Sequence, residues 1–86
     1  MSWEVSWADR ASRDAERLDR RTRERIVEAV ERFAVTDYGD VRRLRGTAGI
    51  WRLRVGDWRV RYRIDGATGV MIILRVQSRG DAYGQL

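Results

Sequence analysis

The stretch 51–64 carries the residues whose types and spacing could most readily do chemistry. It reads WRLRVGDWRVRYRI, so apolar and cationic residues alternate on both sides of Gly56-Asp57. A period of two predicts strands with one face in a core, and a two-residue loop that starts with Gly suits a tight hairpin turn. The cationic face of this hairpin would carry Arg52, Arg54, Arg59, Arg61 and Arg63.

The register of the hairpin follows from pairing its two arms about the loop. Arginines then face each other in pairs on one side, and a slip of one residue would turn them into the core. Like charges directly opposite each other are destabilising, so stability alone does not explain this face, whereas a docked polyanion would. The predicted pairs are Arg54 with Arg59, Arg52 with Arg61, Val55 with Trp58, Leu53 with Val60, and Trp51 with Tyr62.

Phosphate chemistry is what such a cationic face could perform. Several arginines around one phosphodiester can bind the anion and stabilise the charge of a pentavalent transition state. RNA brings its own nucleophile, the ribose 2′-hydroxyl, so a protein could cleave RNA chiefly by holding that hydroxyl in line with the scissile bond. Tyr83 is the best candidate for a proton acceptor, because neighbouring arginines would lower its pKa from about 10. The alternative interpretation is that Tyr83 caps the core.

Composition excludes several other kinds of site. The 86 residues include no Cys and no His, which removes thiolate chemistry, the commonest metal ligand and the commonest general base. The acidic residues are scattered and no Gly-rich phosphate loop is present, so we expect neither a metal nor a cofactor. No run has transmembrane length and the first residues do not resemble a secretory signal, so a cytoplasmic location without membrane contact is expected.

Charge is unevenly distributed along the chain. The formal net charge is +5, and all 18 basic residues are Arg. Residues 38–86 hold 10 of these arginines against four acidic residues, whereas the charges of residues 1–37 nearly balance. This asymmetry indicates a nucleic acid or an acidic protein as the partner of the second part of the chain.

Two helices are expected to precede the hairpin. Residues 2–7 alternate and predict a strand, after which helical spacing begins at Asp9. It predicts a helix over 9–19 and a second over 22–34, forming an antiparallel pair, and a polar, basic connection over 35–49. Their apolar stripes would contain Ala11, Ala15 and Leu18 in the first helix and Ile26, Val30 and Phe33 in the second.

A last strand is expected over 70–76, where the sequence is nearly continuously apolar. Pairing Ile64 with Val70 would set Arg75 beside Arg59 on the cationic face. The core face would then carry Ile72, Leu74 and Val76, and the cationic face Met71, Ile73 and Arg75.

The expected fold is α+β, with the order β-α-α-β-β-β in a single domain over 1–86. The two-helix hairpin would pack on one face of a small, mostly antiparallel sheet, and the open face would collect arginines. Beyond the residues closest to the turn, we expect RNA contacts from Arg45, Arg61, Arg63 and Arg75.

Three segments together resemble the RelE/ParE superfamily of bacterial and archaeal toxins. They are VRRLRG over 41–46, IWRLRVGDWRVRYRI over 50–64, and Arg79 followed by Tyr83. The similarity spans nearly the whole chain, and the pattern of the first two segments is quite specific to the superfamily.

The resemblance implies a toxin of a type II toxin–antitoxin module. RelE-like toxins enter the ribosomal A site and cleave mRNA through 2′-hydroxyl attack, leaving a 2′,3′-cyclic phosphate. A cognate RelB-like antitoxin wraps and neutralises them, and the complex contacts operator DNA only through the antitoxin. The implied partners are therefore an antitoxin, the ribosome and mRNA.

Matching by position carries the family's catalytic set onto five residues. Arg52 and Arg54 fall where RelE-type toxins bear basic residues, many of them lysines, on the strand before the turn, and Arg59 matches the arginine just after it. Arg79 matches a charge stabiliser or general acid, and Tyr83 a tyrosine implicated in base stacking and proton transfer. The missing lysines put a lysine general base in doubt, and the short tail leaves little room for a C-terminal helix.

Two alternatives to the endonuclease remain open from the sequence. ParE-like members share the fold but inhibit DNA gyrase and lack the catalytic set, and Arg79 with Tyr83 favours the RelE branch. The other alternative is an RNA-binding module that docks phosphates without turnover.

Overall fold

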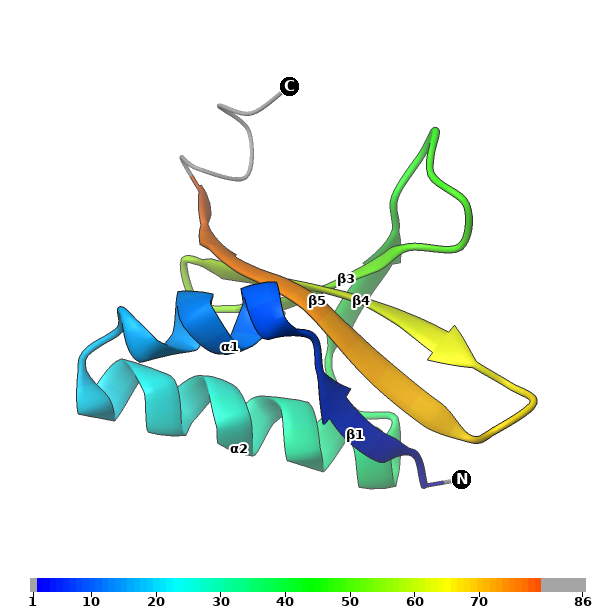
Figure 1. The fold of residues 1–86 in the computed structure, drawn as a ribbon, viewed down its shortest axis with the longest axis horizontal. Helices are drawn as coiled ribbons and strands as arrows, with labels where there is room; N and C mark the ends of the chain where they lie inside the picture. The colour runs from blue at the N-terminus through cyan, green and yellow to red at the C-terminus, as the bar shows by residue number, and fades with distance from the viewer. Residues whose placement is uncertain (1, 80–86) are drawn as a thin grey trace.

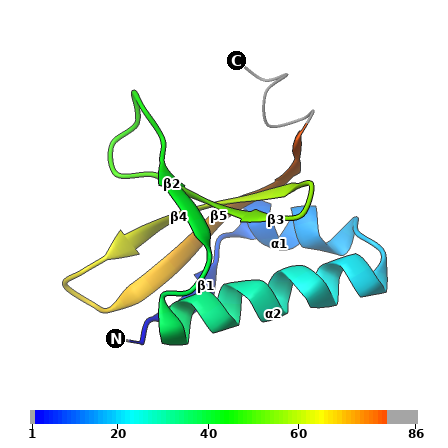
Figure 2. The same cartoon turned by 180° about the vertical axis from the view of Figure 1, so that it is seen from behind.

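The structure, a computed structural model, describes residues 2–79. One five-stranded sheet organises this part of the chain. Its strands lie in the order β1-β5-β4-β3-β2, and β1 is parallel to β5 while the other neighbours are antiparallel. Two helices cover one face, as Figures 1 and 2 show from opposite sides. The elements are β1 (Glu4–Trp7), α1 (Asp9–Glu16), α2 (Arg20–Thr36), β2 (Asp40–Arg43), β3 (Trp51–Val55), β4 (Trp58–Asp65) and β5 (Val70–Ser78).

The expected fold is confirmed, with one strand added. β2 lies inside the segment 35–49 that we expected to be an irregular connection, and it pairs with β3 at the edge of the sheet. It has four residues and a single apolar side chain, Val41, so its alternation is too short to stand out from a polar loop. Neither of the described helices is long and apolar enough to span a membrane.

Local signals explain where α2 begins and ends. The carboxylate of Asp19 accepts a hydrogen bond from the Thr22 N–H at 3.2 Å, which satisfies a donor that the first turn leaves free. At the other end Asp37 adopts a left-handed backbone with φ 61°, and its N–H donates to the Phe33 carbonyl at 2.8 Å. The helix therefore extends two residues beyond each end of the segment expected from its apolar spacing. Asp19 is the N-cap of α2, and α1 ends earlier than expected, at Glu16.

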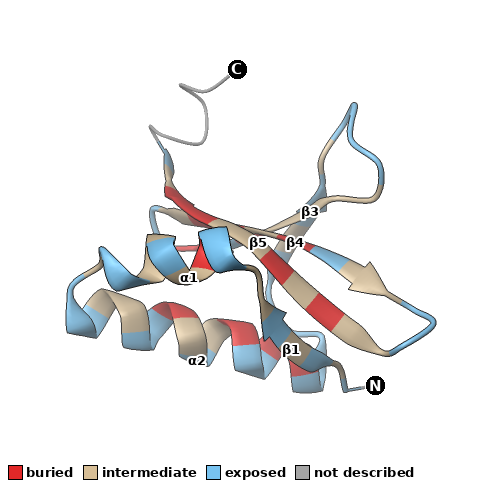
Figure 3. Ribbon diagram, viewed as in Figure 1, coloured by how far each residue is buried: buried red, intermediate tan, exposed pale blue. Residues whose placement is uncertain are grey.

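The core lies between the helices and the inner face of the sheet. Figure 3 shows its buried residues on the inward sides of the helices and along the central strands. All three predicted apolar pairs of the β3–β4 hairpin are confirmed. The buried apolar residues are Ala11, Ile26, Val30, Phe33, Ala34, Leu53, Val55, Val60, Tyr62, Met71, Ile73 and Val76.

The predicted register between β4 and β5 is wrong by one residue at the turn. Asp65, not Ile64, pairs with Val70, because the Asp65 carboxylate accepts the Ala67 N–H at 3.1 Å and its carbonyl accepts the Gly69 N–H at 2.8 Å. A shift of one residue exchanges the two faces of a strand. The core therefore takes Met71 and Ile73 in place of the expected Ile72 and Leu74.

A β-bulge restores Val76 to the core. The register shifts between Arg61 and Tyr62, so that Tyr62 faces Ile73 while Val60 faces Val76. A bulge inserts an unpaired residue into one side of a ladder and bends it locally. Sequence alternation cannot reveal this irregularity, because both candidate faces of β5 are apolar.

Asp14 of α1 takes over the edge of β5 where β1 ends. The last backbone contact of the β1 segment is the Ala8 N–H to the Ile73 carbonyl at 2.9 Å. Farther along β5, the Asp14 carboxylate accepts the Val76 N–H and the Arg75 Nε–H, each at 2.9 Å. Burial alone would raise the pKa of Asp14, but these hydrogen bonds and the charges of Arg75 and Arg10 outweigh it and lower the pKa.

Asp14→Asn is expected to lower the free energy of unfolding at pH 7 by roughly 1.5–3 kcal/mol, because it weakens hydrogen bonds to a charged acceptor. A carboxylate with a lowered pKa stabilises the folded state above its unfolded pKa of about 3.9, and this contribution is lost as the pH falls below that value. The free energies of unfolding of the two proteins, measured with urea, should therefore converge between about pH 5 and pH 2. Glu16→Gln, at an exposed position of the same helix, serves as the control. A pH-independent gap would contradict this account.

Candidate phosphate-binding site

The sheet face opposite the helices carries rows of arginines that run across the strands. One row joins positions on β2, β3, β4 and β5, which are Cα partners in succession, and it consists of Arg42, Arg52, Arg61 and Arg75. A parallel row nearer the β3–β4 turn consists of Asp40, Arg54, Arg59 and Gln77. The predicted pairs Arg54 with Arg59 and Arg52 with Arg61 are confirmed, so like charges do face each other.

Arg59 is the most unusual cation of this face. It is only 5% exposed, its Nε is buried without a partner, and no described carboxylate pairs with it. Its Nη1 donates to the carbonyls of Gly56 and Trp58 over 3.5 and 3.4 Å, distances too long for strong hydrogen bonds. A buried charge with so little compensation is costly, and an anion placed against it would remove that cost.

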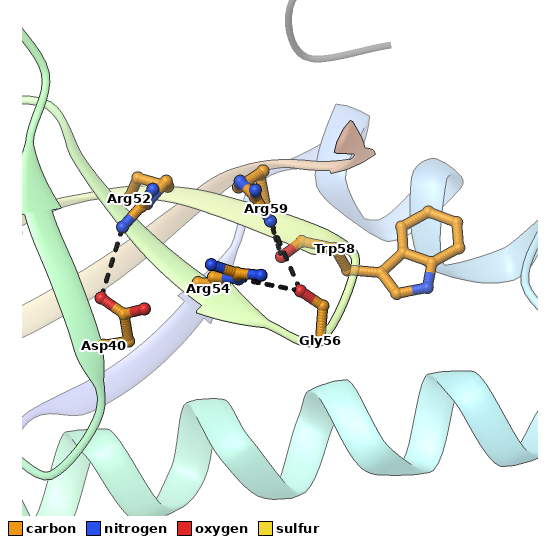
Figure 4. A network of polar contacts seen from close by, with 6 residues as sticks. All are labelled: Asp40, Arg52, Arg54, Gly56, Trp58 and Arg59. Atoms are coloured by element: carbon orange, nitrogen blue, oxygen red, sulfur yellow. Dashed lines mark hydrogen bonds and ion pairs between the residues drawn. The ribbon is translucent and has the colours of Figure 1, made fainter. Parts of the chain in front are cut away.

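Two guanidinium groups approach the Gly56 carbonyl at the turn. Arg54 donates to it through Nε at 3.1 Å, and Arg59 reaches the same oxygen from the neighbouring strand (Figure 4). Gly56 suits this position because its φ is +60°, and a Cβ would lie 2.9 Å from the Arg25 guanidinium. Arg54 and Arg59 are also Cα partners, so two like charges lie side by side, and arginines in this arrangement suit a phosphate group.

Arg52 is only partly neutralised. Its Nη2 lies 3.4 Å from the Asp40 carboxylate, and its Nε is buried without a partner (Figure 4). The Asp40 side chain is 62% exposed, so this ion pair contributes little and is screened by salt. Asp40 therefore leaves most of the positive potential of this face in place.

Arg79 follows β5 beside the same turn. Its backbone N–H donates to the Asp57 carbonyl at 2.9 Å, and the residue is exposed. It comes directly after the end of β5 and two residues after Gln77, which pairs with Arg59. Tyr83, the predicted proton acceptor, lies outside the described residues.

The predicted RNA-contacting residues separate into different environments. Arg61 is half-buried within the row of arginines, and Arg63 is exposed opposite Ile72. Arg45 is exposed in the loop between β2 and β3, which projects from the sheet (Figure 1). Arg75 is half-buried and forms an ion pair with α1.

The expected pairing of Arg75 with Arg59 is wrong. Its Cα partner is Arg61, and its guanidinium is bound to Asp14 of α1 with an Nε–Oδ2 distance of 2.9 Å. Arg75 pairs with Arg61 because of the register of β5. Its side chain reaches Asp14 because the pairing of β1 with β5 ends at Trp7 and leaves this edge of β5 open. Conversely, sequence reasoning did not select Arg42, which faces Arg52, because strand β2 was not foreseen.

The described residues contain cations for binding but few groups for proton transfer. No cluster of three or more Asp or Glu in residues 2–79 could hold a metal ion. Tyr62 is in the core, where burial, with a smaller contribution from Asp37, raises its pKa to about 12. The arrangement can therefore bind and polarise a phosphodiester, and Tyr62 is excluded as its proton acceptor.

Comparisons with known proteins agree with this geometry. A family model described as the ParE toxin of the type II toxin–antitoxin system parDE matches residues 5–83. The chain is similar to Toxin RelG of Mycobacterium tuberculosis, with 35% identity in an alignment of 92 positions. The alignment covers 96% of this chain and 98% of that protein. It is also similar to a chain of the RelBE2 toxin–antitoxin complex of M. tuberculosis, with a TM-score of 0.76, 31% identity and coverage of 92% and 100%. A chain of the archaeal RelE–RelB complex of Pyrococcus horikoshii gives a TM-score of 0.76 at 26% identity, covering 93% and 98%.

Replacing Arg59 is expected to separate stability from anion binding. Arg59→Met should raise the free energy of unfolding by about 1–4 kcal/mol, because it removes a buried charge without a carboxylate partner. Phosphate should raise the Tm of the unmodified protein above its value in chloride of equal ionic strength, and this increment should fall by more than about half in Arg59→Met. Thermal unfolding in the two buffers measures both effects.

The matched control is Arg63→Met, an exposed arginine on the same strand, which should retain the phosphate increment. A destabilised Arg59→Met protein with an undiminished phosphate increment would show that Arg59 is a structural residue and not an anion ligand.

Proposed function

The chain belongs to the ParE toxin family within the RelE/ParE superfamily of type II toxin–antitoxin toxins, and on that premise we propose that it is a ribosome-dependent mRNA endonuclease. The observation that carries the proposal is the buried guanidinium of Arg59, which has no carboxylate partner among residues 2–79 and shares the Gly56 carbonyl with Arg54. A toxin that acts only by docking to a protein has no evident need for this arrangement.

The proposed reaction is an attack of the ribose 2′-oxygen on the adjacent phosphorus. The bond from phosphorus to the 5′-oxygen breaks, a 2′,3′-cyclic phosphate forms, and the departing 5′-oxygen takes up a proton. The exposed Arg54 would bind the non-bridging oxygens, whose negative charge increases in the transition state, and the buried Arg59 would stabilise that charge from beneath. Arg52 and Arg79 would add positive potential on either side of them.

Proton transfer is assigned to Tyr83 in this proposal. Its phenolate would accept the proton of the 2′-hydroxyl if nearby arginines lower its pKa sufficiently. Arginine itself is a poor base, because its pKa lies above about 12. With only one candidate base, most of the catalysis must come from orientation, which can supply roughly 7–11 kcal/mol. The ribosome would provide that orientation by holding the mRNA strand, and a cytoplasmic location follows from that requirement.

A cognate antitoxin is the second proposed partner. Both similar structures described above are toxin–antitoxin complexes by their descriptions, RelBE2 and RelE–RelB, and the arginine face of this chain calls for an acidic ligand. An acidic, RelB-like segment lying over this face or along the β2 edge would block RNA and neutralise the charge. Contact with operator DNA would then come only through the antitoxin.

A gyrase inhibitor is the alternative, and the description of the matching family model favours it. In that case the helices and the chain end would form the inhibitory surface, and the hairpin arginines would contribute only to antitoxin binding. The other alternative, RNA binding without turnover, would use the same face as the endonuclease.

Arg59→Ala and Tyr83→Phe are each expected to reduce cleavage of ribosome-bound mRNA by more than about tenfold, because one removes a ligand of the transition-state charge and the other the proton acceptor. Primer extension on stalled ribosomes measures the cleavage. Arg59→Met, which keeps more side-chain volume, tests whether any loss in Arg59→Ala comes from a disturbed fold.

Arg21→Ala, at an exposed position of α2, is the control and should cleave at the unmodified rate. Unchanged cleavage in both Arg59→Ala and Tyr83→Phe would exclude this mechanism. Inhibition of gyrase supercoiling by the purified protein, with no mRNA cleavage, would instead establish the alternative function.

A further inference from the structure

A second group of arginines lies on α1, away from the sheet face described above. Arg10 and Arg13 lie in α1 and Arg17 is its C-cap with a helical backbone, and their spacings of three and four residues place them on one side of the helix. All three are exposed, and Figure 3 shows the outward side of α1 exposed to solvent. With Asp14 and Arg75 they line a hollow of about 210 Å³.

The carboxylate in this hollow is already engaged. Asp14 accepts hydrogen bonds from Arg75 and from the Val76 N–H, and these hold it at the edge of β5. None of the three helical arginines makes an ion pair within residues 2–79. The hollow therefore carries a surplus of positive charge that the fold does not neutralise, and it offers guanidinium groups that are free to bind an external anion.

The lining of the hollow indicates what kind of anion it suits. It contains only charged side chains, whereas a protein segment needs buried apolar or aromatic anchors to bind with useful affinity. The cleft of about 720 Å³ between α2 and β3 is different, because its lining includes Leu53, Val55 and Tyr38. An RNA backbone needs no apolar anchor, and bidentate contact with phosphate is what arginine provides.

The length of the stripe also fits a nucleic-acid backbone. The helix advances from Arg10 to Arg17 by about 10 Å, at roughly 1.5 Å per residue. A strand of duplex DNA advances about 3.4 Å per nucleotide along its axis, and an A-form RNA strand repeats on the same scale, so the stripe can face more than one phosphate.

We propose that Arg10, Arg13 and Arg17 form a docking surface for ribosomal RNA, separate from the site that receives the cleaved strand. α1 belongs to the helical layer, and the arginine face lies on the other side of the sheet (Figures 1 and 2). One surface would thus contact the ribosome while the other contacts the message. This proposal rests on the proposed function, because it assumes that the ribosome is the site of action.

The test compares two double variants with the same loss of charge. Arg10→Ala/Arg13→Ala removes two arginines of the stripe, and Arg20→Ala/Arg21→Ala removes two exposed arginines at the start of α2. Alanine is the best helix former, so all four substitutions are compatible with the helices. Affinity is measured for 70S ribosomes and for a short RNA duplex across a range of salt concentrations, alongside mRNA cleavage at saturating ribosomes.

The α1 variant is expected to bind both RNA probes roughly tenfold more weakly at low salt, with a log–log salt slope reduced by about 1.4–1.8 for two lost phosphate contacts. Its cleavage at saturation should match that of the unmodified protein, because the hairpin site is intact. The α2 variant should change neither quantity by a comparable amount.

Unchanged affinity and slope in the α1 variant would overturn the proposal, as would weaker binding of an acidic antitoxin peptide with RNA binding unaltered. A failure of this docking proposal is distinguishable from a failure of the proposed endonuclease function. If the unmodified protein cleaves no mRNA, the endonuclease assignment fails, whereas loss of ribosome and duplex binding in the α1 variant would still identify the RNA surface.

Discussion

The carbonyl oxygen of Gly56 is the acceptor around which the candidate site is built. Arg54 and Arg59 approach it from two neighbouring strands, and their opposing positions are dictated by the hairpin register. That register cannot slip, because a shift of one residue would expose Leu53 and Val60 and bury the arginines. The sheet therefore keeps like charges together for the sake of its core, and the turn carbonyl offsets only part of their repulsion.

The other edge of the sheet is stabilised by different means. β1 covers only the first part of β5, and beyond it the Asp14 carboxylate accepts the Val76 N–H that would otherwise lack a partner. The same carboxylate binds the guanidinium of Arg75. Arg75, which we expected to contact RNA, is thereby held by an ion pair within the fold, while Arg59 remains buried without an ion pair among the described residues. The two arginines therefore differ in whether the fold supplies a carboxylate partner, which their positions on the strands do not reveal.

The site was only partly predictable. Alternation over 51–64 was sufficient to place Arg52, Arg54 and Arg59 correctly, since a strong period of two and a glycine turn leave one register. It could not supply β2, whose short alternation contains a single apolar residue, and so Arg42 was missed. The strand partner of Arg75 was predicted wrongly because β5 is apolar on both faces, so alternation gives no signal that would fix its register against β4.

By itself, the sequence determined the periodicities: which segments become helices or strands, which side of the hairpin enters the core, and that arginines gather on the opposite side. Each of these depends on contacts between residues close together in the chain. Only the tertiary structure decided which guanidinium groups find partners, because that depends on elements distant in sequence. Asp14 meets Arg75 across 61 positions, whereas Arg59 is buried beyond the reach of any described carboxylate.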